Sequence, residues 1–449
     1  MSYVDEILES VRKNNPDQPL FLQTVTEVLG SLRPMIEANE ERYRREALLE
    51  RLVEPEKTVM FRVPWTDDRG QAHVNRGYRV QFSSAIGPYK GGLRFASNVT
   101  LDTMKFLAFE QTFKDSLTTM AIGGAKGGSD FDPIGKSDAE VMRFCQSFMT
   151  ELYRYIGADT DSPAGDIGVG AREIGYLYGQ YKRLTGRFEA GAVTGKDPAY
   201  GGSLGRPAAT GNGACYYTQE LFAHLGRELS SARVAISGFG QVAWGVARKM
   251  TELGAKVITI SGPDGYVYDP EGMNEEKVAF LLEMRRTDPM HCKPYADRFG
   301  AEFHAGEKPW GRVKADIYMP CAMQNDIRAD DAARMAAEGS TRLLIEVANM
   351  PTTQEAIDFL LEKGFIIAPS KAVNAGGVAV SAMEMAQNAG KYYWSEEEVE
   401  CKLQAIMKNI FRSSLAAAEK YGMPENLIAG ANLSAAERIL SAMEAQGLV

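Results

Sequence analysis

Cysteine and histidine are scarce in this chain of 449 residues, which contains five cysteines and four histidines. The cysteines stand singly, without CxxC spacing, at Cys145, Cys215, Cys292, Cys321 and Cys401. Isolated cysteines are typical of reduced thiols in a cytosolic protein. The histidines are equally scattered and lack the spacing of metal ligands, so we expect no metal site.

Positive charge and long apolar runs are also in short supply. The chain has 50 Lys and Arg and 59 Asp and Glu, which gives a formal net charge of −9. This charge argues against nucleic acid or an anionic membrane as the main partner. The longest apolar stretch, residues 365–386, includes Lys371 and Glu384, which are costly in hydrocarbon. The first residues show neither a basic nor an apolar segment, so we expect no secretory signal and a cytoplasmic location.

The spacing of apolar residues changes near residue 200. Before it, helical spacing at 21–32, 42–52, 101–117 and 137–155 surrounds strand-like runs at 58–64 and 78–82. Beyond it, short apolar strands at 233–237, 256–260, 316–319, 343–347 and 365–367 are separated by helical stretches, which predicts a parallel doubly wound sheet. Ser434 and Glu437 have the spacing of a capping box, so a C-terminal helix is expected to begin there.

We therefore expect an α/β fold of two domains with a cleft between them. At roughly 100–200 residues per domain, the length agrees with this number. The first would be a substrate-binding and oligomerisation domain of residues 1–200, joined by the C-terminal helix 425–449. The second would be a Rossmann-type dinucleotide-binding domain of residues 201–424.

A glycine motif follows the strand at 233–237 and opens a helix. Gly238-Phe-Gly240-Gln241-Val242-Ala243 is the dinucleotide fingerprint with Ala in the third position. Its first Gly allows a tight turn, its second lets the backbone approach a pyrophosphate, and the helix N-terminus offers amide donors. A turn that serves packing alone is the alternative. Asp264, in the turn after the next strand, would repel a 2′-phosphate, which favours NAD over NADP.

Three lysines stand in an unusual setting. Lys90 and Lys126 are flanked by glycine, and Lys114 ends the run Phe109-Glu-Gln-Thr-Phe-Lys114. Any one of them alone would be a solvated surface lysine. Together they predict a cleft that holds a dianionic substrate, with a lysine of lowered pKa suited to proton transfer. Asp166, among glycines and a proline, is either a carboxylate positioned for acid–base chemistry or an ordinary turn residue.

In combination these motifs resemble the hexameric bacterial glutamate dehydrogenases of the Glu/Leu/Phe/Val dehydrogenase family, with the NAD-linked clostridial members nearest in pattern. The resemblance runs from about residue 20 to the end, through GPYKGGLR, GGAKGGSDFDP, PAGDIGVG, GGSLGRP, SGFGQVAWG, VANMPTT and PSKAVNAGGVAVS. It implies a homohexamer that interconverts L-glutamate with 2-oxoglutarate and ammonia, using NAD or NADP.

The resemblance also implies roles for individual residues. Lys90 and Ser381 would hold the γ-carboxylate. Lys126 would activate the water that attacks the iminium, and Asp166 would transfer protons to and from the amine. The α-carboxylate would be held by Gln111 and Lys114 near the Gly165 backbone, and Arg206 would also contact substrate. The cofactor contacts would come from Thr210, Gly238, Gly240, Gln241, Val242, Asp264, Asn349 and Asn374.

The sequence departs from the family pattern at Asn212, Gln241, Met323, Ala382 and Met383. Two alternatives therefore stay open. One is an amino-acid dehydrogenase of altered substrate range, and the other is a non-catalytic nucleotide-sensing homologue.

Overall fold

The chain folds into two compact units in the computed structural model, which describes residues 2–448. The first unit contains the chain up to Leu204, residues 378–399 and the part from Asn432 onward; the second contains Gly205–Gly377 and Glu400–Ala431. Residues 378–399 fall inside the range 201–424 expected for the dinucleotide-binding domain. They join the first unit because Glu384 and Gln387 of helix α15 (Gly376–Gly390) hydrogen-bond to residues 195–203.

A five-stranded mixed sheet forms the centre of the first unit, in the order β1-β2-β4-β3-β5. Strand β1 pairs with β2, and β2 with β4, in antiparallel fashion, whereas β3 runs parallel to both β4 and β5. The strands are β1 (Lys57–Thr66), β2 (Ala72–Ser83), β3 (Tyr89–Phe95), β4 (Gly124–Ser129) and β5 (Asp161–Gly165). The three later strands are rich in glycine and lack the β-branched pattern, so the sequence indicated only the first two.

Two aromatic clusters attach helices to this sheet. Phe131 and Phe144 stack with ring centroids 3.7 Å apart in a core that includes β3 and helices α6 and α7. Phe82 of β2 packs on Phe109 of α5 at 5.4 Å. The helices named here are α5 (Leu101–Leu117), α6 (Asp138–Leu152) and α7 (Ala171–Thr185). The predicted bounds of α5 are confirmed.

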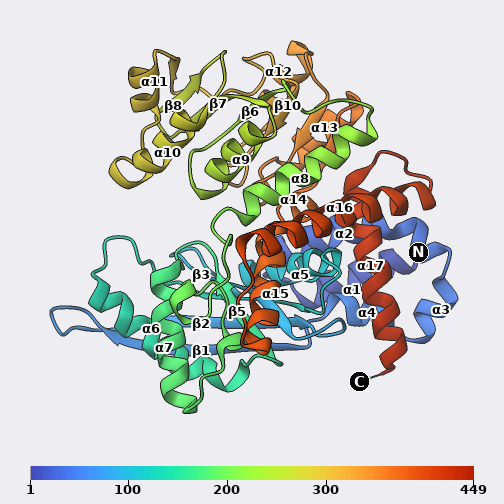
Figure 1. Cartoon of the computed structure of the whole chain (residues 1–449). Helices are drawn as coiled ribbons and strands as arrows, with labels where there is room; N and C mark the ends of the chain where they lie inside the picture. Colours follow the sequence, from blue (N-terminus) through green and yellow to red (C-terminus); the bar gives the residue numbers. More distant parts are fainter. Residues whose placement is uncertain (1, 449) are drawn as a thin grey trace. The chain divides into compact units, whose positions relative to one another are not determined.

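The first helices of the chain and its last helix lie side by side in the first unit (Figure 1). Asn432 on α17 (Leu427–Gln446) donates to Ser31 on α2 (Pro19–Glu37), and Arg42 on α3 (Glu40–Arg45) pairs with Glu444. The remaining helices here are α1 (Tyr3–Asn14) and α4 (Leu48–Val53).

Two helix predictions in these regions were wrong. The expected helix 42–52 is broken between α3 and α4 by Ala47, whose φ of 47° lies in the left-handed region. Ser434 does not cap the last helix, because α17 begins at Leu427 and Ser434 lies within it. The cap is Asn426, whose side-chain oxygen accepts from the Ala429 amide at 3.0 Å.

The second unit contains a seven-stranded sheet in the order β12-β11-β10-β6-β7-β8-β9. Strands β12, β11, β10, β6 and β7 are parallel, which confirms the doubly wound core. An entirely parallel sheet was a wrong expectation, because Pro263 and Asp264 form a tight turn that folds β8 back onto β7, and β9 follows in antiparallel fashion. The strands are β6 (Arg233–Ile236), β7 (Lys256–Gly262), β8 (Gly265–Tyr268), β9 (Glu302–Ala305), β10 (Ile317–Met319), β11 (Leu343–Ile345) and β12 (Ile366–Ala368).

Three helices connect consecutive parallel strands of the second unit, as a doubly wound sheet requires: α9 (Gln241–Glu252), α12 (Ala329–Glu338) and α13 (Gln354–Glu362). The other helices of this unit are α8 (Ala209–His224), α10 (Glu275–Thr287), α11 (Lys293–Phe299), α14 (Ser370–Val373) and most of α16 (Glu396–Lys420). Within residues 2–448, no helix has both the length and the apolar character needed to cross a bilayer.

Candidate active site

Strand β3 carries Lys90 into the interior of the first unit. Lys90 pairs with Ser162 of β5, and its Nζ donates to the Ser162 carbonyl at 2.9 Å. The side chain is completely buried. Lys90 and Lys126, the two lysines flanked by glycine, both lie in strands of the sheet, Lys90 in β3 and Lys126 in β4.

Lys126, Asp166 and Arg94 form a three-residue cluster. Lys126 Nζ lies 3.0 Å from one carboxylate oxygen of Asp166, and Arg94 Nε lies 2.7 Å from the other. Arg94 ends the same GPYKGGLR motif that contains Lys90, and Asp166 directly follows β5. The sequence left open whether Lys126 and Asp166 meet; the structure brings them into contact.

The glycines beside these lysines allow the strands to approach the Lys126–Asp166 ion pair. A Cβ at Gly91 would lie 1.6 Å from the Ala125 carbonyl oxygen, and a Cβ at Gly92 would lie 2.9 Å from the Asp166 Cβ. Heavy atoms cannot approach this closely, so any side chain at Gly92 would displace Asp166. The glycines serve close packing around the site rather than turning of the chain.

Helix α5 supplies a second group of charges to the same unit. Gln111 donates to the Asp115 carboxylate at 2.6 Å. Burial, together with the charge of Lys126, lowers the pKa of Lys114 to about 8. Burial raises the pKa of Asp115 well above its usual value, although Lys90, Lys114 and Lys126 oppose that change. The three lysines are therefore close enough to influence one another and Asp115.

The charges of the cluster determine its protonation states. Burial alone would raise the pKa of Asp166, but Lys126 and Arg94 outweigh it and hold that pKa below the usual range. Burial lowers the pKa of Lys126, and Asp166 limits the decrease. Such a site combines an ionised carboxylate with an ammonium that can release its proton more readily than a surface lysine.

Two charged residues in this region, Arg94 and Asp115, were not singled out in the sequence. Arg94 binds Asp166 directly, and Asp115 is fully buried beside the lysines. The signal for Arg94 was present, since it shares the Lys90 motif on a strand where residues i and i+4 face the same side. Asp115 follows Lys114 immediately, but an Asp at the end of a helix gives no indication of burial.

Ser381 and Gly165 also lie in the first unit. Ser381 is buried on α15. Gly165 ends β5, where a Cβ would lie 2.5 Å from the Val169 carbonyl oxygen. The residues expected to bind substrate are therefore all in this unit except Arg206, which belongs to the second unit and borders Gly377 there.

The glycine motif of the second unit has the geometry of a phosphate-binding turn. Gly238 has a φ of 78°, in the region that favours glycine, and Gly240 is the N-cap of α9. A Cβ at Gly240 would meet nothing within 4 Å, so the turn leaves open space in front of the first amides of the helix, beginning with Val242. These observations fit a dinucleotide pyrophosphate at this helix N-terminus.

Other residues expected to contact the cofactor already have partners. Asn374 Nδ2 donates to Asn349 Oδ1 at 2.8 Å and to the Val347 carbonyl at 3.1 Å. Gln241 donates to the Pro207 carbonyl at 2.7 Å. Thr210 lies on α8 next to Gly377, where a Cβ would lie 2.6 Å from its hydroxyl.

Asp264 accepts hydrogen bonds from the backbone amides of Cys292 and Lys293, at 2.9 and 3.1 Å, and so fixes the start of α11. This contact is the structural role of a turn residue, which the sequence also allowed.

Comparison with known proteins agrees with this arrangement. The family model described as Glutamate/Leucine/Phenylalanine/Valine dehydrogenase matches residues 201–447, and the one described as Glu/Leu/Phe/Val dehydrogenase, dimerisation domain, matches residues 55–183. The chain belongs to this family. Its predicted membership and its two-domain α/β fold are thereby confirmed.

Full-length relatives include both cofactor classes. The chain is 58% identical to an NAD-specific glutamate dehydrogenase of Clostridium symbiosum, with 99% of each chain covered. It is 51% identical to an NADP-specific glutamate dehydrogenase of Haemophilus influenzae, with 99% of this chain and 98% of the relative covered. Among solved structures, a Plasmodium falciparum glutamate dehydrogenase superposes with a TM-score of 0.95 at 45% identity, covering 99% and 95% of the two chains.

The departures from the family pattern have structural explanations in two cases. Asn212 is buried on α8 and donates to Glu400, which also accepts from Tyr216 and pairs with Lys249 at 2.9 Å. Met323 is 67% exposed in the loop after β10. Ala382 and Met383 are buried on α15, directly after Ser381.

Proposed function

We propose that this chain catalyses the oxidative deamination of L-glutamate to 2-oxoglutarate and ammonia, and the reverse reductive amination, with NAD as the hydride carrier. The observation that carries this proposal is the Lys126–Asp166–Arg94 cluster beside Lys90 and Lys114. Four cations accompany two carboxylates there, and the cations in excess are available to bind the two carboxylates of a dicarboxylate substrate. The identities to glutamate dehydrogenases support the same reaction.

Each end of the substrate would meet a different lysine. Lys90 and Ser381 would bind the γ-carboxylate, which explains a completely buried ammonium in β3. Lys114 and Gln111 would bind the α-carboxylate, near the Gly165 backbone. An apolar substrate would leave the buried Lys90 charge without a counter-charge, which is costly. The presence of Lys90 therefore favours glutamate over leucine, phenylalanine or valine.

Proton transfer would fall to Lys126 and Asp166. Asp166 is held ionised by its two cations, so it can accept a proton from the substrate ammonium and return it in the reverse direction. Lys126 has a lowered pKa, so it can take a proton from the water that attacks the substrate iminium. Dinucleotide held at the Gly238–Gly240 turn would supply the acceptor for the hydride from the substrate Cα.

NAD is favoured over NADP by the charge at the end of β7. Asp264 would repel a 2′-phosphate, and the ammonium of Lys293, whose amide binds Asp264, pairs with Asp297 at 2.5 Å. The remaining contacts to the dinucleotide would come from Thr210, Gln241, Val242, Asn349 and Asn374, and Arg206 would contribute to the substrate site. We further propose a cytoplasmic homohexamer, in which residues 1–200 and 425–449 bind substrate together with Ser381 and Arg206, and the rest of residues 201–424 bind dinucleotide.

The proposal is tested with the Lys126→Ala variant. We expect it to lose turnover while retaining dinucleotide binding, measured by quenching of protein fluorescence. An unchanged rate would remove Lys126 from the mechanism. Dinucleotide binding by a wild-type protein that shows no turnover of glutamate would favour the nucleotide-sensing alternative. Initial rates with norvaline and leucine address the other alternative, since Ala382 and Met383 are buried on the same helix as Ser381. A preference for either over glutamate would contradict the proposal.

A further inference from the structure

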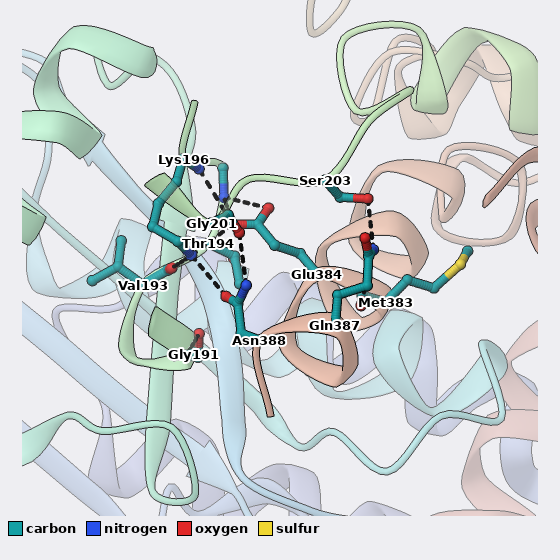
Figure 2. A network of polar contacts seen from close by, with 12 residues as sticks. Gly191, Val193, Thr194, Lys196, Gly201, Ser203, Met383, Glu384, Gln387 and Asn388 are labelled. Atoms are coloured by element: carbon teal, nitrogen blue, oxygen red, sulfur yellow. Dashed lines mark hydrogen bonds and ion pairs between the residues drawn. The ribbon is translucent and has the colours of Figure 1, made fainter. Parts of the chain in front are cut away.

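A buried ion pair joins α15 to the segment of residues 193–203 (Figure 2). Lys196 Nζ lies 2.7 Å from Glu384 Oε1, and both side chains are completely buried. The ammonium also donates to the Val193 carbonyl and, at 3.0 Å, to Asn388 Oδ1. All three of its donors are therefore used. The carboxylate accepts in addition from the amide of Gly195 at 3.0 Å.

Two neighbouring side chains of α15 extend this contact along the 193–203 segment. Asn388 donates to the Gly201 carbonyl at 2.7 Å, and Gln387 donates to the Ser203 hydroxyl at 2.8 Å. Figure 2 shows Glu384, Gln387 and Asn388 turned toward the segment from one helix. The helix is thereby held against the segment at three successive levels.

The same segment is tied to the strand beside Lys90. The Thr194 amide donates to the Pro163 carbonyl of β5 at 2.8 Å, and Ser162 Oγ donates to the Gly191 carbonyl at 2.8 Å. Ser162 is the residue whose carbonyl accepts from Lys90 Nζ. Gly191 lies two residues before the segment, and Thr194 within the segment bonds to Pro163, so the segment and Lys90 are tied to adjacent residues of β5.

On the other side of the pair lies Ser381. It precedes Glu384 by three residues on α15, and residues at this spacing lie on neighbouring positions of one helix face. Anchoring Glu384 therefore fixes both the rotation and the axial position of Ser381. The ion pair connects the two residues proposed to bind the γ-carboxylate, although it belongs to neither.

Stability alone does not account for a pair buried this deeply. The desolvation cost of two charges commonly equals or exceeds their attraction, and apolar replacements are often neutral or stabilising. What a fully hydrogen-bonded pair supplies is a single geometry, since any shift would leave buried donors or acceptors unsatisfied. We propose that Lys196 and Glu384 are positioning residues that set the distance between Lys90 and Ser381, and thereby the selectivity for a substrate with a distal carboxylate. This inference rests on the proposed roles of Lys90 and Ser381.

The test compares glutamate with norvaline, which has an uncharged side chain in place of the distal carboxylate. In Lys196→Met and in the double variant Lys196→Met, Glu384→Gln, we expect the KM for glutamate to rise at least about tenfold, since misplacement by 1 Å can cost about 100-fold. We expect kcat for glutamate and KM for norvaline to change less than about threefold. The double variant leaves no unpaired buried charge, so it provides the measurement if the single variant does not fold.

Lys277→Met is the matched control. Lys277 pairs with Asp269 at 2.6 Å in the second unit, and both side chains are largely buried. Loss of that pair is expected to lower the melting temperature without changing the ratio of the two KM values. Equal changes in KM for glutamate and norvaline in the Lys196 variants, or a lower melting temperature with unchanged KM values, would overturn the positioning role.

A Lys90→Met variant separates this inference from the proposed function. If Lys90→Met loses the preference for glutamate while the Lys196 variants keep it, the subsite stands and the positioning role is refuted. If Lys90→Met still prefers glutamate, the proposed subsite is refuted, and the positioning role with it. Loss of the preference in both supports both.

Discussion

Replacing Gly92 by alanine should disable the site without unfolding the protein. The new Cβ would lie 2.9 Å from the Asp166 Cβ and 2.8 Å from the Gly165 carbonyl oxygen. Carbon atoms prefer separations of about 3.5–4.0 Å, so Asp166 must retreat by roughly 0.6–1 Å. A displacement near 1 Å costs about 100-fold in rate, which corresponds to about 2.7 kcal/mol in activation free energy.

The assay is the initial rate of NADH formation at saturating glutamate, with dinucleotide binding measured in parallel. We expect kcat to fall about 100-fold while the affinity for NAD is unchanged, because the glycine turn that would bind it belongs to the second unit. Gly179→Ala is the control: Gly179 lies within α7, and a Cβ there would meet nothing within 4 Å. That variant should keep full activity and gain about 0.5–1 kcal/mol of stability. A Gly92→Ala enzyme with kcat within threefold of the wild type would refute the role given to the position of Asp166.

Three further predictions follow from the charges. The pKa of Lys114 is lowered to about 8, so its ammonium loses a proton above that pH, and the inhibition constant of glutarate should rise with pH above about 8. Lys114→Met should bind glutarate weakly at every pH. A pH-independent inhibition constant in the wild type would contradict the role proposed for Lys114. Burial raises the pKa of Glu346 from 4.5 to about 7, so its contribution to stability is complete below pH 4.5 and is lost as the pH rises through 7. Glu346→Gln should therefore gain stability relative to the wild type between pH 5 and 8, by up to about 3 kcal/mol, and equal melting temperatures across that range would show that Glu346 is not so perturbed. Arg94→Met should lower kcat with glutamate by at least about tenfold, because it removes one of the two cations that keep Asp166 ionised; an unchanged kcat would mean that Lys126 alone is sufficient.

Local patterns of the sequence predicted the parts of the fold that depend on neighbouring residues. Helix α5 was expected over its observed range, and the strand, turn and helix around Gly238 appear where the glycine motif indicated. In these segments the apolar period and the turn residues point to the same structure. The range 425–449 given to the C-terminal helix lies close to α17, but the start expected at Ser434 was wrong because Ser434 lies within a helix that begins at Leu427.

The strands around the site could not be predicted from local preference. Strands β3, β4 and β5 consist largely of glycine, lysine, serine and alanine, which do not favour strands in isolation. Their conformation is determined by long-range pairing, in which glycine lets the backbones and the side chains proposed to be catalytic approach. For the same reason the contact of Arg94 with Asp166 and the pair of Lys196 with Glu384 join residues that are 72 and 188 positions apart. No spacing rule in the sequence connects them.

The assignment of cofactor and substrate is tested most directly by glutamate-dependent reduction of NAD and NADP, measured side by side on the same enzyme. We predict rapid NADH formation that requires glutamate, with kcat/KM for NAD at least about tenfold above that for NADP, because Asp264 is proposed to repel a 2′-phosphate. A preference for NADP would contradict the cofactor assignment. No reduction of either dinucleotide in the presence of glutamate would contradict the account of the cation cluster as a glutamate site.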